Sequence, residues 1–96
     1  MTKIRIAENV DAKLVEAYQK LTPQLSSSNP PPTEDELKAI IGSDSATILV
    51  AEDANGIILG SMTLVIFRIP TGIRAWIEDV VVDTQARGMG VGQALN

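Results

Sequence analysis

The stretch from Val80 to Gly92, VVVDTQARGMGVG, joins a run of valines to a segment with three closely spaced glycines. The apolar residues predict a strand from Trp76 to Val82, and the glycine-rich segment is expected to open a helix at about Met89. The first N–H groups of a helix have no partner inside it, and the aligned peptide dipoles favour negative charge there. Glycine lets the backbone approach a ligand closely, because it carries no Cβ. The pattern Arg87-x-x-Gly90-x-Gly92 therefore predicts a binding site for a phosphate or pyrophosphate.

Other phosphate-binding motifs fit this stretch less well. A dinucleotide-binding G-x-G-x-x-G pattern would need a glycine where the chain has Gln93, and an acidic residue about 20 positions later. A phosphate loop of the G-x-x-x-x-G-K-[ST] type would need a lysine and a hydroxyl that are missing from the stretch. A flexible glycine turn without a ligand is the remaining alternative, and the strand that precedes the glycines makes it less favoured.

The same stretch resembles the signature of the GNAT superfamily of acetyl-CoA-dependent N-acetyltransferases. The segment from Glu78 to Val82 is followed by Arg87, Gly90 and Gly92, which fill the family's pattern Gln/Arg-x-x-Gly-x-Gly/Ala. The resemblance implies a GNAT-type acyl-CoA N-acyltransferase fold, with acetyl-CoA as co-substrate and a primary amine as acceptor. It implies that the coenzyme's pyrophosphate is held by Arg87, Gly88, Met89, Gly90, Val91 and Gly92. By the same resemblance, the pantetheine arm is expected to bond the main chain of Val80, Val81 and Val82.

Composition limits the chemistry that the chain can carry. The 96 residues make one domain at most, and their apolar content of 45% is enough for a modest core. The chain has no cysteine and no histidine, so acid–base chemistry falls to carboxylates, the single Tyr18, lysines or water. We expect no metal cofactor. A net charge of −4 argues against a nucleic-acid partner, and the lack of a signal peptide or a long apolar run predicts a cytoplasmic protein.

The rest of the chain predicts alternating apolar strands and amphipathic helices. Tyr18 lies on an apolar helix stripe, which favours packing over a catalytic hydroxyl. The loop rich in serine and proline is either a plain connector, slightly favoured, or a substrate-covering loop, since the GNAT family places acceptor-binding residues between its first two helices. Gly60 is expected to mark a bulge or a close backbone approach.

The expected elements of the first half are a strand at Lys3 to Ala7, a helix capped by Asn9 or Asp11 and running to Leu21, a loop from Pro23 to Pro32, and a helix with a Thr33/Glu36 capping box ending at Gly42. The second half is expected to form strands at Ala46 to Glu52 and Ile57 to Ile66, joined by the turn Asp53 to Gly56, and then a turn from Arg68 to Arg74.

The element order is thus β, α, α, β, β, β, α, an α/β (α+β) class with a mostly antiparallel sheet. Continuous apolar runs in the middle strands predict helices on both faces of this sheet. The order matches the N-terminal half of the GNAT arrangement. Residues 1–96 are therefore expected to form a single GNAT domain, truncated after the start of the coenzyme-binding helix, with the C-terminal strands missing.

Glu78 and Asp79 are adjacent carboxylates in an otherwise apolar strand. Strict alternation would place Trp76, Glu78, Val80 and Val82 on one face, and Ile77, Asp79 and Val81 on the other. Burial raises the pKa of a carboxylate, which is the direction that a general base needs. Glu78 is the first candidate for the catalytic base and Asp79 the second, and the alternative for Glu78 is a salt bridge to Arg74 or Arg68.

Three features of the resemblance bear on mechanism. The strand is similar to the one in glucosamine-phosphate N-acetyltransferases, where these acidic residues lie at the acceptor site. Other GNAT branches carry their base two residues earlier, at the position of Trp76, so catalysis by positioning and main-chain polarisation is a second possibility. The family's general-acid tyrosine falls in the missing part.

The missing fifth strand would leave the strand from Trp76 to Val82 at an open sheet edge, which invites another chain. This predicts a homodimer, or pairing with another chain that supplies the second half. The acceptor is expected to be a small-molecule or peptide amine whose identity the sequence does not give. A half-domain that binds acetyl-CoA or a partner without turnover is the alternative to an enzyme.

Overall fold

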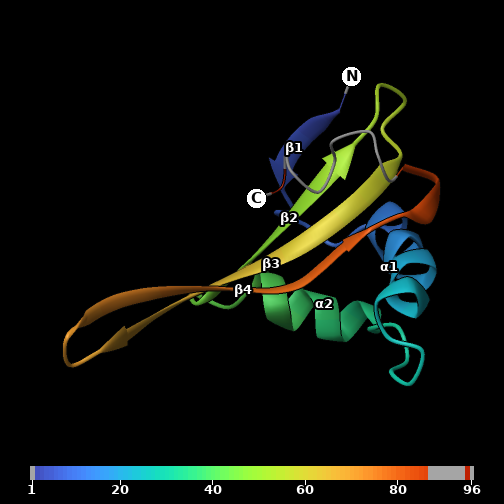
Figure 1. Cartoon of the computed structure of the whole chain (residues 1–96). Coiled ribbons are helices and arrows are strands. Elements are labelled where there is room, and N and C mark those ends of the chain that lie inside the picture. The colour runs from blue at the N-terminus through green and yellow to red at the C-terminus, as the bar shows by residue number, and fades with distance from the viewer. Residues whose placement is uncertain (1, 87–94, 96) are drawn as a thin grey trace.

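The computed structural model describes residues 2–86 and 95. The chain forms a four-stranded sheet, and Figure 1 shows helices lying against this sheet and one long hairpin projecting away from the body. The elements in chain order are β1 (Lys3–Ile6), α1 (Ala12–Leu25), α2 (Glu34–Ile41), β2 (Ala46–Glu52), β3 (Ile58–Ile69), β4 (Gly72–Val82) and the short 3-10 helix η1 (Thr84–Ala86).

The sheet is antiparallel throughout, in the order β1-β2-β3-β4. The chain passes through α1 and α2 between β1 and β2, although these two strands are neighbours in the sheet. The predicted mostly antiparallel α+β fold is confirmed. The strand predicted at Ala46 to Glu52 has the bounds expected for it.

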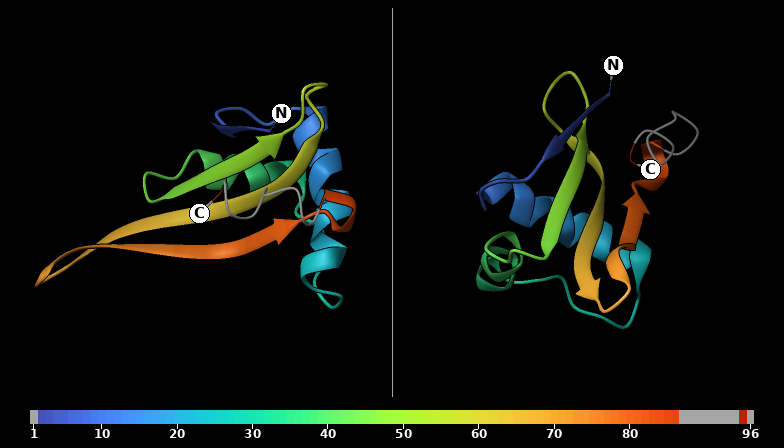
Figure 2. Two further views of the ribbon diagram at one scale, coloured as in Figure 1. Left: turned by 45° about the horizontal axis from the view of Figure 1, so that its top comes forward. Right: turned by 90° about the vertical axis from the view of Figure 1, so that its left-hand side faces the viewer.

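Both described helices pack on one face of the sheet, as the views in Figure 2 show. Leu14 and Leu21 of α1 and Leu37 of α2 are almost fully buried there against Ile48 and Val50 of β2. On the other face a smaller cluster joins Met62 and Ala51 to Ala86 and Leu95. The helix expected to begin at Met89 lies outside the described residues. Neither described helix is long and apolar enough to cross a membrane.

The helix starts follow the local sequence signals. The Asp11 carboxylate accepts a hydrogen bond from the Leu14 amide at 2.8 Å, so Asp11, and not Asn9, caps α1. At α2 the Thr33 hydroxyl accepts from the Glu36 amide at 3.1 Å, while the Glu36 carboxylate accepts from the Thr33 amide at 2.9 Å. This is the predicted capping box, in which the two residues satisfy each other's backbone donors.

The prediction that the loop begins at Pro23 is wrong. Pro23 lies inside the last turn of α1, and the Ser26 amide still donates to the Thr22 carbonyl at 2.9 Å. A proline near the end of a helix removes one backbone donor and leaves the following turn intact. The loop therefore starts only after Leu25.

The last hairpin is longer than predicted. β3 runs to Ile69 and β4 begins at Gly72, so the turn shrinks from the expected Arg68 to Arg74 to the two residues Pro70 and Thr71. Gly72 adopts a φ of +140°, a conformation that other residues rarely adopt, which allows this tight return. Beyond the body of the sheet, β3 and β4 pair only with each other and form the projecting arm in Figure 1, and the molecule is 42 Å long as a result.

Candidate functional site

A bulge in β4 places Asp79 in an unusual conformation. Thr63 pairs with Glu78 and Ser61 with Val81, so Asp79 and Val80 together oppose the single Met62. Asp79 has a φ of +52°, the only positive value for a non-glycine residue in the described part of the chain. An extra residue of this kind locally twists a strand and redirects its side chains.

The bulge overturns the predicted alternation along the strand. Directly opposed residues in an antiparallel pair point to the same face. Glu78 therefore lies on the helix-covered face with Thr63, and Val81 also lies on that face and is buried in the main core. Val80 and Val82 pack against the cluster on the other face. A strict period of two fails because Asp79 takes up the extra position.

A cavity of about 560 Å³ lies on the helix-covered face, within the size range of small-molecule sites. α1, α2 and the loop between them form three of its walls. The strands contribute the remaining wall, and the Asp79 side chain belongs to it. The loop residues Ser26, Asn29, Pro30 and Pro32 all line the cavity, as a substrate-covering loop would require.

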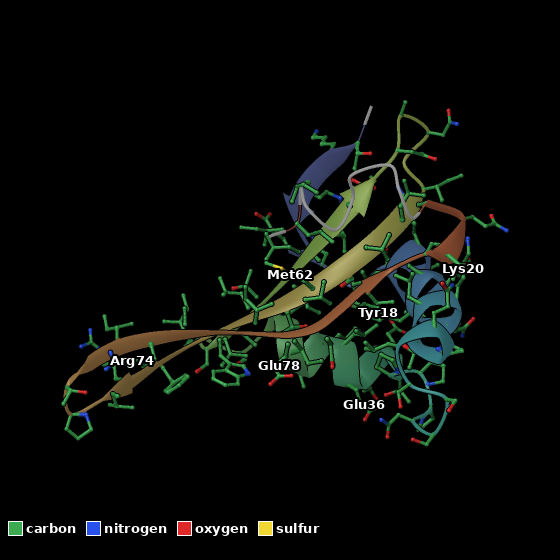
Figure 3. All side chains as sticks on the ribbon, in the orientation of Figure 1. Tyr18, Lys20, Glu36, Met62, Arg74 and Glu78 are labelled. Carbon is green, nitrogen blue, oxygen red and sulfur yellow. The ribbon has the colours of Figure 1, made fainter. Side chains whose placement is uncertain are left out.

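Tyr18 also lines the cavity and combines packing with a hydrogen bond. Its hydroxyl bonds to the hydroxyl of Ser61, which is only 1% exposed. Burial raises the pKa of Tyr18, the bond to Ser61 opposes this effect, and the negative charge of Asp79 adds to it. The hydroxyl is therefore held neutral at physiological pH. Figure 3 shows Tyr18 on α1, beside the end of β4.

Glu78 and Asp79 lie differently relative to the cavity. Both side chains are exposed. Glu78 accepts a hydrogen bond from the Trp76 indole N–H and does not line the cavity. The salt bridge considered for Glu78 is absent from the described residues: Arg74 instead donates to Thr71 and to the Ile73 carbonyl, at 3.2 Å each, in the arm. Asp79 is thus the carboxylate of this pair that reaches the cavity.

The end of β4 is fixed to α1 by contacts that the sequence did not predict. Asp83 is 2% exposed and lies 2.5 Å from the Lys20 ammonium. The hydrogen bond from Lys20 lowers the pKa of Asp83, burial opposes this, and the Gln85 amide, which donates to the carboxylate at 3.1 Å, lowers it further. The Gln24 side chain accepts from the Thr84 amide at 2.8 Å. The sequence offered one signal for these contacts, which is an acidic residue directly after a valine strand. Its partner is a lysine on the helix that packs against that strand.

The residues predicted to hold the coenzyme fall in two groups. Arg87, Gly88, Met89, Gly90, Val91 and Gly92 lie outside the described residues, so their site remains a prediction. Val80, Val81 and Val82 end the last strand of the described sheet, and η1 leads from them toward the glycine motif. Within residues 2–86 and 95 no group of acidic side chains is arranged to hold a metal ion.

Comparisons with known proteins agree with this arrangement. The model of the acetyltransferase (GNAT) family matches residues 14–95. A comparison with curated proteins finds no match. Among solved structures, an acetyltransferase of Trypanosoma brucei is 28% identical with a TM-score of 0.75, and the alignment covers 99% of this chain and 69% of that one.

Two further structures are similar at lower identity and support the fold alone. A GNAT family acetyltransferase of Staphylococcus aureus is 21% identical with a TM-score of 0.80, over 98% of this chain and 71% of that one. An aminoglycoside acetyltransferase from an uncultured soil metagenomic sample, in complex with sisomicin, is 20% identical with a TM-score of 0.81, over 98% of this chain and 64% of that one. The chain thus spans about two thirds of the length of these proteins. With a family match over most of its residues and the GNAT fold in its described part, the chain belongs to the GNAT acetyltransferase family.

Proposed function

We propose that the protein transfers an acetyl group from acetyl-CoA to a primary amine bound in the cavity between α1, α2 and the sheet. The observation that carries the proposal is the position of Asp79. Asp79 lines the cavity, and three residues later the strand ends and leads to the glycine motif. An acceptor amine in the cavity would therefore meet a base close to the strand that is expected to hold the coenzyme.

The end of β4 suits the pantetheine arm in one respect. β4 is the last strand of the described sheet, so the edge of Val80 and Val81 that faces away from β3 has no other described strand beside it. Main-chain amide and carbonyl groups on such an edge can bond an extended ligand as they would bond another strand. Arg87 to Gly92 would then bind the pyrophosphate, as the family resemblance implies.

The reaction requires a neutral amine, because an ammonium has no lone pair. In the proposed mechanism Asp79 accepts a proton from the acceptor ammonium, directly or through one water. The amine nitrogen attacks the thioester carbonyl, the carbon–nitrogen bond forms, and the carbon–sulfur bond breaks to release the coenzyme A thiolate. The nitrogen loses a second proton as the amide forms, and the thiolate takes it up, while Asp79 returns the first proton to solvent. Glu78 is the second candidate for the base, because it lies on the same sheet face one residue away.

The test is a titration with acetyl-CoA, followed by a thiol-release assay with a panel of amines. Asp79→Asn should lower kcat at neutral pH by about 10²-fold, the usual scale for loss of a general base, while acetyl-CoA binding is retained. Glu78→Gln should have a smaller effect. Asp35→Asn is a matched control, because Asp35 is an exposed carboxylate on α2 that does not line the cavity.

The outcomes separate the candidate functions. Binding of acetyl-CoA with thiol release supports the enzyme. Binding without release for any amine supports the second candidate, a half-domain that binds coenzyme or a partner without turnover. A rate unchanged in Asp79→Asn and lost in Glu78→Gln would assign the base to Glu78. A rate retained in both variants would favour catalysis by positioning.

We also propose that two chains associate through the edge of β4 in the arm, from Arg74 to Glu78, which leaves the edge of Val80 and Val81 to the pantetheine arm. The arm exposes large apolar side chains on both faces, among them Ile73, Trp76 and Ile77. Two β4 strands paired antiparallel about Trp76 would place Arg74 of one chain opposite Glu78 of the other, and neither residue has an ionic partner in the described part of its own chain. Opposite charges in such cross-strand positions are favourable.

A further inference from the structure

The cavity between α1, α2 and the sheet has an unbalanced charge. Two carboxylates, Glu36 of α2 and Asp79 of β4, are among its lining residues. None of the described lining residues is a lysine or an arginine. An acceptor that carries a phosphate or carboxylate would meet two like charges and no described partner, which is unfavourable in a partly desolvated site.

Glu36 is held in a defined orientation, unlike most exposed glutamates. Its Oε1 accepts the Thr33 amide at 2.9 Å in the capping box, and the next residue, Leu37, is fully buried. No described residue donates to Oε2. A side chain fixed in this way loses little rotamer freedom when it binds a cation. Binding therefore costs it less conformational entropy than it costs a mobile surface glutamate.

The rest of the lining suits an aliphatic body. Leu25, Pro30, Ile40 and Ile48 come from four different segments and give the cavity a largely apolar wall. An alkyl chain can pack against these side chains while polar groups at its ends remain near the carboxylates. A flat, hydroxyl-rich or anionic molecule would use this lining less well.

We propose that the acceptor is an aliphatic dication, that is, a primary amine whose carbon chain carries a second ammonium or guanidinium group. Asp79 takes the amine that reacts, and Glu36 binds the second cation and so determines specificity. The assignment of Asp79 rests on the proposed acetyl transfer. The role of Glu36 rests on the cavity alone and can be measured without turnover.

The test compares three sets of compounds on the intact chain: α,ω-diaminoalkanes of increasing length, the n-alkylamines with the same number of carbons, and glucosamine 6-phosphate as an anionic amine. Binding is measured by calorimetry without acetyl-CoA, and kcat/KM is measured with it. We expect the best diamine to exceed its matching monoamine by about tenfold in both measurements, the scale of one charge-assisted hydrogen bond. This preference should fall as salt is added, because both carboxylates are exposed enough to be screened.

Two variants with the same change of charge isolate Glu36. Glu36→Gln keeps an oxygen that can complete the capping box, so the helix start is preserved. Glu34→Gln, in the same helical turn, removes an equal charge from a residue that pairs with Lys38 at 3.3 Å and does not line the cavity. Glu36→Gln should abolish the preference for diamines and leave monoamines unchanged, whereas Glu34→Gln should retain it. Thermal unfolding followed by circular dichroism checks that both variants are folded.

Several results would overturn the inference. They are equal binding of diamines and monoamines by the unaltered protein, tighter binding of glucosamine 6-phosphate, or a diamine preference that survives in Glu36→Gln. Other results distinguish the ligand class from the proposed function. Diamine binding that depends on Glu36, without any thiol release, would support the ligand class and reject acetyl transfer. Turnover of all amines without discrimination would support acetyl transfer and reject the ligand class.

Discussion

The Lys20 ammonium lies 2.5 Å from the carboxylate of Asp83, although 63 positions separate the two residues. Asp83 is almost completely buried, while Lys20 is half exposed. The pair joins the outer surface of α1 to the residue that directly follows β4. A buried carboxylate is stable only if it is paired, so the contact fixes where the strand ends relative to the helix.

Removing the ammonium should destabilise the protein. In Lys20→Met the Asp83 carboxylate would stay buried without its cation, and we expect the free energy of unfolding to fall by about 1–3 kcal/mol. Urea unfolding at pH 7 measures the change. Lys3→Met is a suitable control, because the exposed Lys3 forms none of the ion pairs found in the described part of the chain. An equal loss in both variants would contradict the assignment.

The same pair predicts a dependence on pH. The pKa of Asp83 is lower in the folded protein, mainly because of the hydrogen bond from Lys20. Its contribution to stability is therefore fully present above the pKa of the unfolded state, about 3.9, and is lost as the pH falls through the lower folded value. Asp83→Asn should be less stable than the unaltered protein at pH 7, and the difference should shrink below about pH 4. A constant difference from pH 7 to pH 2 would show that the charge of Asp83 is not involved.

The bulge at Asp79 predicts that stability and activity respond in opposite directions. A positive φ costs a non-glycine residue about 1 kcal/mol, and glycine removes this cost. Asp79→Gly should therefore unfold at an equal or higher urea concentration than the unaltered protein while losing acetyl transfer. Asp79→Asn, which tolerates the same conformation, separates the carboxylate from the backbone effect. Strong destabilisation in Asp79→Gly would argue that the side chain supports the fold.

Tyr18 and Ser61 should behave as a coupled pair. Tyr18→Phe removes the hydroxyl that bonds to the buried Ser61, leaving a polar group without its partner, and should cost about 1 kcal/mol of stability. Ser61→Ala alone should have a similar cost, and the double variant should lose less than the sum of the two. A double-mutant cycle by urea unfolding measures the difference. Strict additivity would show that the two hydroxyls do not interact.

The proposed pairing of β4 edges predicts a charge-dependent dimer. Sedimentation velocity should show association that weakens in Arg74→Glu and in Glu78→Arg. Mixing the two single variants should restore it, because the two acidic residues of one chain then face the two basic residues of the other, and the double swap Arg74→Glu with Glu78→Arg should restore it as well. A monomer at all protein concentrations would refute the pairing.

Local signals in the sequence predicted the parts of the fold that depend on neighbouring residues. The Thr33/Glu36 capping box, the cap at Asp11 and the bounds of β2 all follow from contacts within a few positions. Gly60 was expected to mark an irregularity, and the register between β2 and β3 does shift beside it. These features need no information from distant parts of the chain.

The features that the sequence did not predict depend on long-range packing. The bulge at Asp79 replaces the period of two that the alternation argument assumed, and it moves Glu78 and Val81 to the same face. α1 continues through Pro23 to Leu25, and Gln24 in this last turn contacts Thr84, 60 positions away. The pairing of Lys20 with Asp83 likewise joins residues that no local pattern connects. The cavity was only partly anticipated, because Glu36 was interpreted as a cap and not as a lining residue.

The bond between Gln24 and Thr84 has a consequence for the order of events in a catalytic cycle. Gln24 precedes the cavity residue Leu25 on α1, and Thr84 begins the segment that leads to the coenzyme motif. A displacement of the α1 end on acceptor entry would therefore be felt directly at Thr84 through this bond. Thermodynamic linkage requires the effect to be reciprocal, so each ligand should alter the affinity for the other by the same factor.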